Sequence, residues 1–160
     1  TYTQGLYDAD QMLGELAEWI DGRERPTVLV FFGDHMPTLG SNYLAYNESG
    51  LFNSLDGLDH EELMTMYSTP FLIYSNRELD SGLFQSNTDN MISDYNLLNA
   101  VAEATGFGRT PYMNLLLDFY QVTPVYNVRL GMEVTERIDY FAGAMEYITY
   151  DRVFGKNYTG

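Results

Sequence analysis

The chain has 160 residues, of which 45% are hydrophobic and 15% aromatic; this content suits one packed domain and excludes a disordered segment. Acidic residues outnumber basic ones by 23 to 8, giving a formal net charge of −15, which argues against nucleic acid as a partner because phosphate binding needs clustered Lys and Arg. The chain lacks cysteine, which excludes disulfides, thiolate metal sites and a cysteine nucleophile, and it has no run of about 18 apolar residues that could span a membrane.

The pattern of the first half of the chain predicts one helix followed by two strands. Apolar residues recur at helical spacing over residues 5–21, which indicates an amphipathic helix. Residues 27–32 form an unbroken β-branched and aromatic run, typical of a strand buried on both faces of a parallel sheet. The polar and acidic residues 41–62 predict an insertion loop with one helical turn, and residues 70–74 predict a second apolar strand. A helix that leads into a buried strand is typical of α/β architecture.

The second half of the chain is mainly helical in pattern. Apolar residues at helical spacing from residue 91 onward predict a helix that ends at Gly106, a suitable C-cap. Pro111 opens a further predicted helix over residues 111–120, since proline suits a first helical turn. Residues 124–130 predict irregular structure, and residues 135–154 predict a last helix.

The most informative stretch is residues 31–37, FFGDHMP. The apolar run stops at Gly33, and Asp34 and His35 follow at once, where open α/β folds place their ligands. A carboxylate beside a neutral imidazole suits Mn²⁺, Zn²⁺ or Mg²⁺. We expect Gly33 to free the backbone so that both side chains reach one ion. From the residues alone, a capping Asp and a packing His explain the pair about equally well.

Four segments resemble, in order and spacing, the sulfatase and lipoteichoic-acid-synthase branch of the alkaline phosphatase superfamily. Residues 31–37 resemble its hydrophobic–Phe/Tyr–Gly–Asp–His–x–Pro metal motif. Residues 7–14 (YDADQMLG) resemble the helix before that motif, and residues 68–76 (STPFLIYSN) resemble the strand after it. Residues 148–158 (ITYDRVFGKNY) resemble the ending of many membrane-anchored members. One Gly-Asp-His is a weak signal, whereas four matches in the family's order are a specific one.

The resemblance implies that residues 1–160 are the C-terminal part of a sulfatase-like catalytic domain, which has a mostly parallel central sheet flanked by helices. Residues 1–76 would form the α/β portion with the metal motif, and residues 77–160 a mainly helical portion. By resemblance Asp34 and His35 are metal ligands, whereas the family's other ligands, a Glu and a Thr that is also the nucleophile, lie upstream of this motif. We therefore expect half a metal site and no catalytic residue in this chain, with its substrate-binding residues unassigned. The implied ion is Mn²⁺ first, with Mg²⁺, Zn²⁺ or Ca²⁺ as alternatives.

The function that the resemblance implies is ping-pong transfer of phosphoglycerol from a phospholipid head group to an envelope glycolipid or polymer. It further implies N-terminal transmembrane helices outside this chain and an outward-facing domain on the cell membrane of a Gram-positive bacterium. Two enzyme alternatives are a sulfatase, which needs an upstream formylglycine, and a phosphoethanolamine transferase. An alternative from another class is a non-catalytic envelope binding module that kept the fold and lost the site. The presence of Asp34 and His35 speaks against that last alternative.

Other polar residues carry weaker signals. His60 lies in an acid-rich stretch, which is better explained as a solvated face than as a second metal site. Thr38 and Ser41 follow the motif and could meet a phosphate, but loop capping is the better explanation. Three residues near the end of the chain are predicted to pack its tail onto the body: Tyr150, Asp151 and Tyr158.

Overall fold

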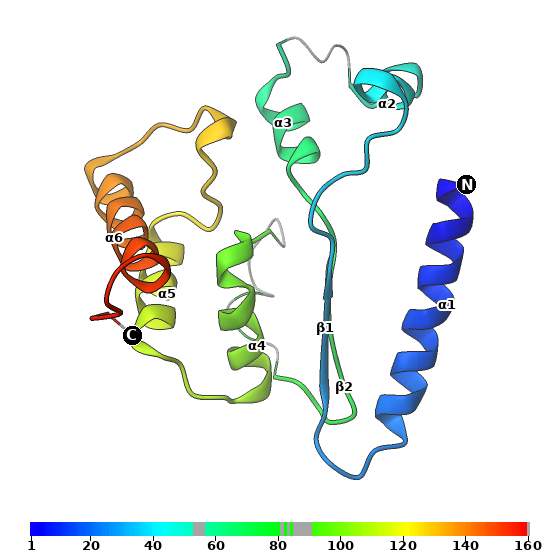
Figure 1. Cartoon of the computed structure of the whole chain (residues 1–160), viewed down its shortest axis with the longest axis horizontal. Helices are drawn as coiled ribbons and strands as arrows, with labels where there is room; N and C mark the ends of the chain where they lie inside the picture. The colour runs from blue at the N-terminus through cyan, green and yellow to red at the C-terminus, as the bar shows by residue number, and fades with distance from the viewer. Residues whose placement is uncertain (53–56, 81, 83, 85–90, 160) are drawn as a thin grey trace. The chain divides into compact units, whose positions relative to one another are not determined.

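The computed structural model describes residues 1–52, 57–80, 82, 84 and 91–159. The chain forms two compact units, an N-terminal unit (Thr1–Asp80) and a C-terminal unit (Ser81–Gly160). Figure 1 shows the helices and the strand pair that make up the two units. Within the described part of the chain, no helix is both long enough and apolar enough to cross a membrane.

The N-terminal unit contains a long helix, a strand pair and two short helices. The helix predicted over residues 5–21 is confirmed and begins earlier, because the Thr1 hydroxyl caps it by accepting a hydrogen bond from the Gln4 amide (3.4 Å). Both predicted strands are confirmed. The elements in order are α1 (Tyr2–Asp21), β1 (Val28–Phe32), the 3₁₀ turn η1 (Ser41–Tyr43), α2 (Leu44–Glu48), α3 (His60–Met66) and β2 (Phe71–Ser75).

The segment predicted as a loop with one helical turn, residues 41–62, is more helical than that. It contains η1, α2 and the start of α3, while residues 53–56 lie outside the described residues. Asp59 and Glu62 begin α3 with a reciprocal cap: the Asp59 carboxylate accepts from the Glu62 amide (2.9 Å), and Glu62 accepts from the Asp59 amide (3.0 Å). The acidic residues around His60 therefore serve the start of a helix.

The two strands pair antiparallel, with Val28 opposite Ser75 and Phe32 opposite Phe71. The described residues thus contain α/β structure, but they do not contain a mostly parallel sheet. The prediction that β1 is buried on both faces is wrong within this chain, since Phe31 is 39% and Phe32 is 55% exposed. The physical reason is that a two-stranded ribbon with one long helix beside it cannot cover both of its faces.

Asn76, directly after β2, ties the connection between α1 and β1 to the end of the ribbon. Its Nδ2 group donates two hydrogens among three carbonyls, those of Ile20 (3.1 Å), Arg23 (2.8 Å) and Arg25 (3.1 Å), so that one hydrogen is shared. Its Oδ1 accepts from the Thr27 amide (2.9 Å). One side chain therefore satisfies backbone groups that a turn of irregular conformation cannot pair by itself.

The C-terminal unit contains α4 (Leu97–Thr105), α5 (Pro111–Val122) and α6 (Glu136–Val153), with the 3₁₀ turns η2 (Asp94–Asn96) and η3 (Val128–Leu130). All three predicted helices are confirmed. Gly106 ends α4 in the left-handed conformation (φ 71°), as predicted. The first of these helices begins later than predicted, because residues 94–96 form a 3₁₀ turn instead of α-helix.

Stacked aromatic rings form the core of the C-terminal unit. The Phe119 ring is fully buried and lies parallel to the rings of Tyr95 (centroids 5.9 Å apart, 2° between planes) and Phe141 (5.3 Å, 10°). Ile138 completes the buried cluster. Burial raises the pKa of Tyr95 to about 12, because the phenolate would have to be ionised away from water.

The C-terminal tail folds back onto the end of α6. The Asp151 carboxylate accepts hydrogen bonds from the amide (2.8 Å) and the hydroxyl (2.9 Å) of Thr159. These bonds, the amide bond first, lower the pKa of Asp151. The predicted packing role is thus confirmed for Asp151 and wrong for Tyr158, which is 82% exposed; the ring of Tyr150, itself 63% exposed, contacts that of Phe154 (centroids 5.8 Å apart).

Candidate metal site

The loop that follows β1 is held at two points. At its start, the Gly33 amide donates to the Pro70 carbonyl (3.1 Å), and the Thr69 hydroxyl donates to the Gly33 carbonyl (2.8 Å). Further along, the hydroxyl of the buried Tyr46 donates to the Pro37 carbonyl (2.7 Å). The loop between these two points contains the predicted metal ligands, and hydrogen bonds fix both of its ends.

Gly33 is needed for its small size and not for conformational freedom. Its φ lies outside the left-handed region, which corrects the expectation that glycine frees the backbone at this position. A Cβ atom on Gly33 would lie 3.0 Å from the Cβ of Thr69. Glycine therefore allows the close approach that places the Thr69 hydroxyl on the Gly33 carbonyl. By contrast, Gly40 further along the loop does require glycine's freedom, with φ 81°.

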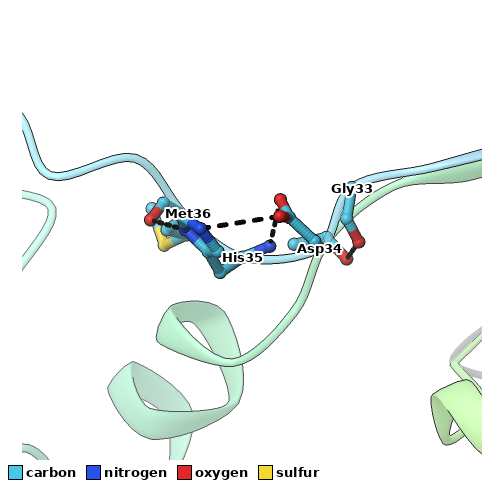
Figure 2. A network of polar contacts seen from close by, with 5 residues as sticks. Gly33, Asp34, His35 and Met36 are labelled. Atoms are coloured by element: carbon cyan, nitrogen blue, oxygen red, sulfur yellow. Dashed lines mark hydrogen bonds and ion pairs between the residues drawn. The ribbon is translucent and has the colours of Figure 1, made fainter.

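Asp34 and His35 lie next to each other at the surface, with their side chains in contact (Figure 2). The Asp34 Oδ1 atom accepts from the His35 amide (2.9 Å), and Asp34 Oδ2 is 3.6 Å from His35 Nε2. The other ring nitrogen, Nδ1, is 2.9 Å from the Met36 carbonyl oxygen. The side chains of Asp34 and His35 are 83% and 75% exposed.

The hydrogen bond to Met36 decides which nitrogen of His35 can bind a cation. A carbonyl oxygen only accepts, so Nδ1 carries a proton, and Nε2, which lies beside Asp34, is the ring nitrogen that can offer a lone pair to a cation. Metal-bound imidazoles in proteins are held in the same way by a second acceptor. Two donor atoms each about 2.1 Å from one ion lie 3.6 Å apart when the angle at the ion is about 120°. The pair therefore fits two positions of a divalent ion's coordination shell.

The pair does not make a complete site. Among residues 1–52, 57–80, 82, 84 and 91–159, no three His, Cys, Asp or Glu side chains are grouped so that they could hold a metal ion. A structural or catalytic divalent ion takes four or more ligands. His60 accordingly belongs to no such group, and Thr38 and Ser41 are exposed residues after the motif.

Sequence reasoning missed the residues that position the motif. Thr69, Pro70 and Asn76 lie in the segment that resembles the family's second strand, but no role was predicted for them. Each hydrogen-bonds to backbone far away in the sequence. The available signal was their location: polar or turn-forming residues that flank an apolar strand on both sides.

The family model described as Sulfatase matches residues 1–107 of this chain, from α1 to just after α4. The chain therefore belongs to the sulfatase family, in the alkaline phosphatase superfamily, as the resemblance predicted. The match covers the whole N-terminal unit, including the Asp34–His35 pair.

The chain is also similar to a protein of Rhizobium meliloti (strain 1021) named "Putative cyclic beta-1,2-glucan modification protein". The two are 24% identical over 169 aligned positions, which cover 99% of this chain and 26% of that protein. The chain thus spans about a quarter of the length of this relative. No solved structure matches the chain at a significant level.

Proposed function

We propose that this chain supplies the Asp–His half of a divalent metal site to an enzyme that transfers phosphoglycerol from a phospholipid to an envelope glucan, glycolipid or polymer. The observation that carries the proposal is the Asp34–His35 pair, whose donor atoms lie 3.6 Å apart with the imidazole oriented by Met36. Family membership supports a hydrolase or transferase acting on ester groups. The relative named for the modification of a cyclic glucan supports an envelope carbohydrate as the acceptor.

In this proposal the residues of the chain bind and orient. Asp34 provides an anionic oxygen and His35 a neutral nitrogen, and the Met36 carbonyl keeps the imidazole in the tautomer that can bind. Thr69 and Pro70 keep the loop in place on β2. A divalent ion, when bound, would lower the pKa of an attacking hydroxyl and offset charge on the phosphoryl oxygens. Mn²⁺ is the first candidate because imidazole disfavours Mg²⁺, and Zn²⁺ and Ca²⁺ are alternatives.

We further propose that the ribbon of β1 and β2 is part of a larger, mostly parallel sheet in the whole catalytic domain. Apolar side chains on the ribbon are exposed within this chain, including Phe32 (55%), Phe71 (40%) and Leu72 (40%). Soluble proteins rarely leave such a cluster uncovered without a partner. The upstream part of the domain, with the remaining metal ligands and the nucleophile, is the proposed cover.

The proposal includes an outward-facing position at the cell envelope, with anchoring helices outside this chain. The phospholipid head group is the proposed donor, and no role for nucleic acid is proposed because the chain carries a net charge of −15. A Gram-positive source stays a prediction. A sulfatase and a phosphoethanolamine transferase remain the enzyme alternatives, and the name of the glucan-modifying relative favours transfer over sulfate hydrolysis.

The test is a Mn²⁺ titration of the chain followed by electron paramagnetic resonance of the free ion. Two ligands give weak binding, and we expect the double variant Asp34→Asn, His35→Gln to weaken it at least tenfold. The double variant Asp10→Asn, His60→Gln is the matched control. It removes the same two groups elsewhere in the N-terminal unit, so the two double variants have the same net charge. Equal affinity in the two double variants would show that Mn²⁺ binds only to the general negative charge, and the metal proposal would fail.

A second measurement separates the enzyme alternatives. The complete domain, with its upstream part, is assayed with phosphatidylglycerol, phosphatidylethanolamine and an aryl sulfate. We expect release of diacylglycerol from phosphatidylglycerol, because the proposed transfer moves its glycerol phosphate head group to the acceptor and leaves diacylglycerol; release from phosphatidylethanolamine alone would indicate a phosphoethanolamine transferase. Turnover of the aryl sulfate alone would assign the chain to a sulfatase instead.

A further inference from the structure

A cavity of about 930 Å³ lies in the N-terminal unit, between the η1–α2 segment and α3. One wall is formed by residues of η1 and α2, including Asn42, Tyr43 and Asn47. The facing wall is formed by α3 and the residue after it, including Leu63, Met66 and Tyr67. Its volume lies within the roughly 300–1,000 Å³ that is usual for small-molecule sites.

Both walls of this pocket are continuous with the segments that hold the metal motif. Residue 41 directly follows Gly40, and a Cβ atom on Gly40 would lie 3.4 Å from the Cβ of Leu44, another pocket residue. Tyr67 comes two residues before Thr69, whose hydroxyl holds the Gly33 carbonyl. In Figure 1, α2 and α3 lie beyond the end of the ribbon at which β1 stops. The pocket and the Asp34–His35 pair are therefore positioned by the same backbone.

The chemistry of the walls excludes an anionic ligand and suits a neutral one with hydroxyl groups. None of the described residues that line the pocket is charged, so a phosphate or carboxylate would meet no cation among them. Amide, hydroxyl and phenol groups face the cavity together with Leu and Met side chains. A sugar unit presents the same combination, with hydroxyls around a ring whose face is apolar.

Asn47, a residue of the pocket wall, has a hydrogen-bond acceptor that is unsatisfied within the described part of the chain. The Oδ1 atom of Asn47 is buried and has no hydrogen-bond partner among the described residues. A buried acceptor without a partner is unfavourable, and rotation of the Asn47 side chain that brought Oδ1 to a donor on a ligand would relieve this. Two adjacent residues on this wall, Asn42 (φ 51°) and Tyr43 (φ 56°), adopt the left-handed conformation that costs non-glycine residues energy. Such strain is concentrated where a binding surface must hold a particular shape.

We propose that this pocket binds a neutral sugar unit of the acceptor, with a sugar hydroxyl donating to Asn47 Oδ1. The proposal rests on the proposed function and names the acceptor class for the same site: an uncharged glycan that enters beside the metal motif. The anionic phospholipid head group is assigned elsewhere, because the described residues of the pocket walls offer it no positive charge.

The test is an NMR titration of the metal-free chain with sophorose, the β-1,2-linked disaccharide of glucose, and separately with glycerol 1-phosphate. We expect saturable shifts of the pocket amides with sophorose, with a Kd in the millimolar range, and no saturation with glycerol phosphate. Asn47→Leu removes the acceptor and Met66→Trp fills the cavity, and each should weaken sophorose binding at least tenfold. Asn114→Leu, on the exposed side of α5, is the matched control and should leave it unchanged.

Three outcomes would overturn the proposal: no saturable shift with sophorose, equal binding by both pocket variants and the control, or tighter binding of glycerol phosphate at the same amides. The use of two unrelated variants keeps the test informative if one of them fails to fold. Because no metal is present, a failure here leaves the Mn²⁺ result intact. A failure of the Asp34→Asn, His35→Gln experiment likewise leaves sugar binding in place.

Discussion

The two units of the molecule differ in the interactions that stabilise each of them. Nine of the twelve buried hydrophobic residues in the described part of the chain lie in the C-terminal unit, around the stacked ring of Phe119. The N-terminal unit has three, Ile20, Tyr46 and Phe52, and relies on long-range hydrogen bonds such as those of Asn76 and the Tyr74 hydroxyl to Asp21 (2.7 Å). The unit that carries the metal motif is therefore the one with little core of its own.

The difference between the units also shows in the residues that the family match covers. The Sulfatase model covers all of the N-terminal unit and reaches only to residue 107 of the C-terminal one. The matched segments contain the motif loop and the side chains that fix it to backbone, such as Thr69 and Asn76. The family match thus includes both the motif loop and the side chains that hold that loop in place.

Phe119→Ala is the largest expected perturbation and tests whether the C-terminal unit depends on its core. Loss of a fully buried aromatic ring should lower the free energy of unfolding by about 3–5 kcal/mol. Urea unfolding is followed by amide signals of α5 and α6, and separately by the fluorescence of Trp19, the chain's single tryptophan, in the N-terminal unit. We expect the Trp19 midpoint to stay unchanged. Equal shifts of both signals would show that the two units unfold as one.

Leu98→Ala is the control for that experiment. Leu98 lies on α4 in the same unit and is 67% exposed. Its truncation should change stability by no more than about 0.5 kcal/mol.

Asn76→Ala tests whether hydrogen bonds hold the N-terminal unit. It removes the donor shared by the Ile20, Arg23 and Arg25 carbonyls and the acceptor of the Thr27 amide, so we expect a loss of about 1–3 kcal/mol. Trp19 fluorescence during urea unfolding measures it. Asn76→Asp keeps the acceptor but places a carboxylate oxygen against the three carbonyls, so we expect its loss to be at least as large as that of Asn76→Ala. An unchanged midpoint in both variants would mean that core packing holds this unit as well.

Gly33→Ala tests the close approach beneath the metal motif. The added Cβ would be 3.0 Å from Thr69 Cβ, and the overpacking should cost about 1–3 kcal/mol and weaken Mn²⁺ binding. Gly14→Ala is the matched control: it lies within α1 with no atom within 4 Å of the new Cβ, and should stabilise the chain by up to about 1 kcal/mol. If both substitutions stabilise the chain, Gly33 has no steric role.

The smallest effect concerns the tail of the C-terminal unit and its pH dependence. Hydrogen bonds from Thr159 lower the pKa of Asp151 in the folded state, so this contact stabilises the fold above the unfolded pKa of about 3.9. The stabilisation is lost as the pH falls further, through the lowered folded value. We expect the Thr159 amide resonance to move in that window, and Asp151→Asn to remove the transition. A Thr159 amide that does not respond below pH 4 would contradict this assignment.

Much of the local structure could be predicted from the sequence because its causes are local. Thr1, Thr110 and Thr135 each accept a hydrogen bond from an amide three residues on, and Gly106 supplies a left-handed C-cap, so helix boundaries follow from nearby residues. The reciprocal cap of Asp59 and Glu62 was equally visible as an Asp-x-x-Glu pattern, and the loop prediction overlooked it.

The candidate site was predicted only as two residue types in sequence. Asp34 and His35 stand out because a carboxylate and an imidazole follow an apolar strand at a glycine. The Met36 carbonyl that selects the ring nitrogen, and the pocket beside the motif, involve backbone direction and residues up to about thirty positions away. Composition and periodicity carry no information on such contacts.

The sequence by itself determined the family, the four predicted helices, the two strands and the adjacent Asp–His pair, because each depends on motifs and patterns of residues that are neighbours along the chain. Only the tertiary structure decided that the strands pair antiparallel, that position 33 needs a small residue because Thr69 lies close, and that Asn47 has a buried acceptor atom without a partner among the described residues. The physical reason is that pairing direction, steric approach and hydrogen-bond satisfaction depend on distances between segments, which folding sets and local sequence does not.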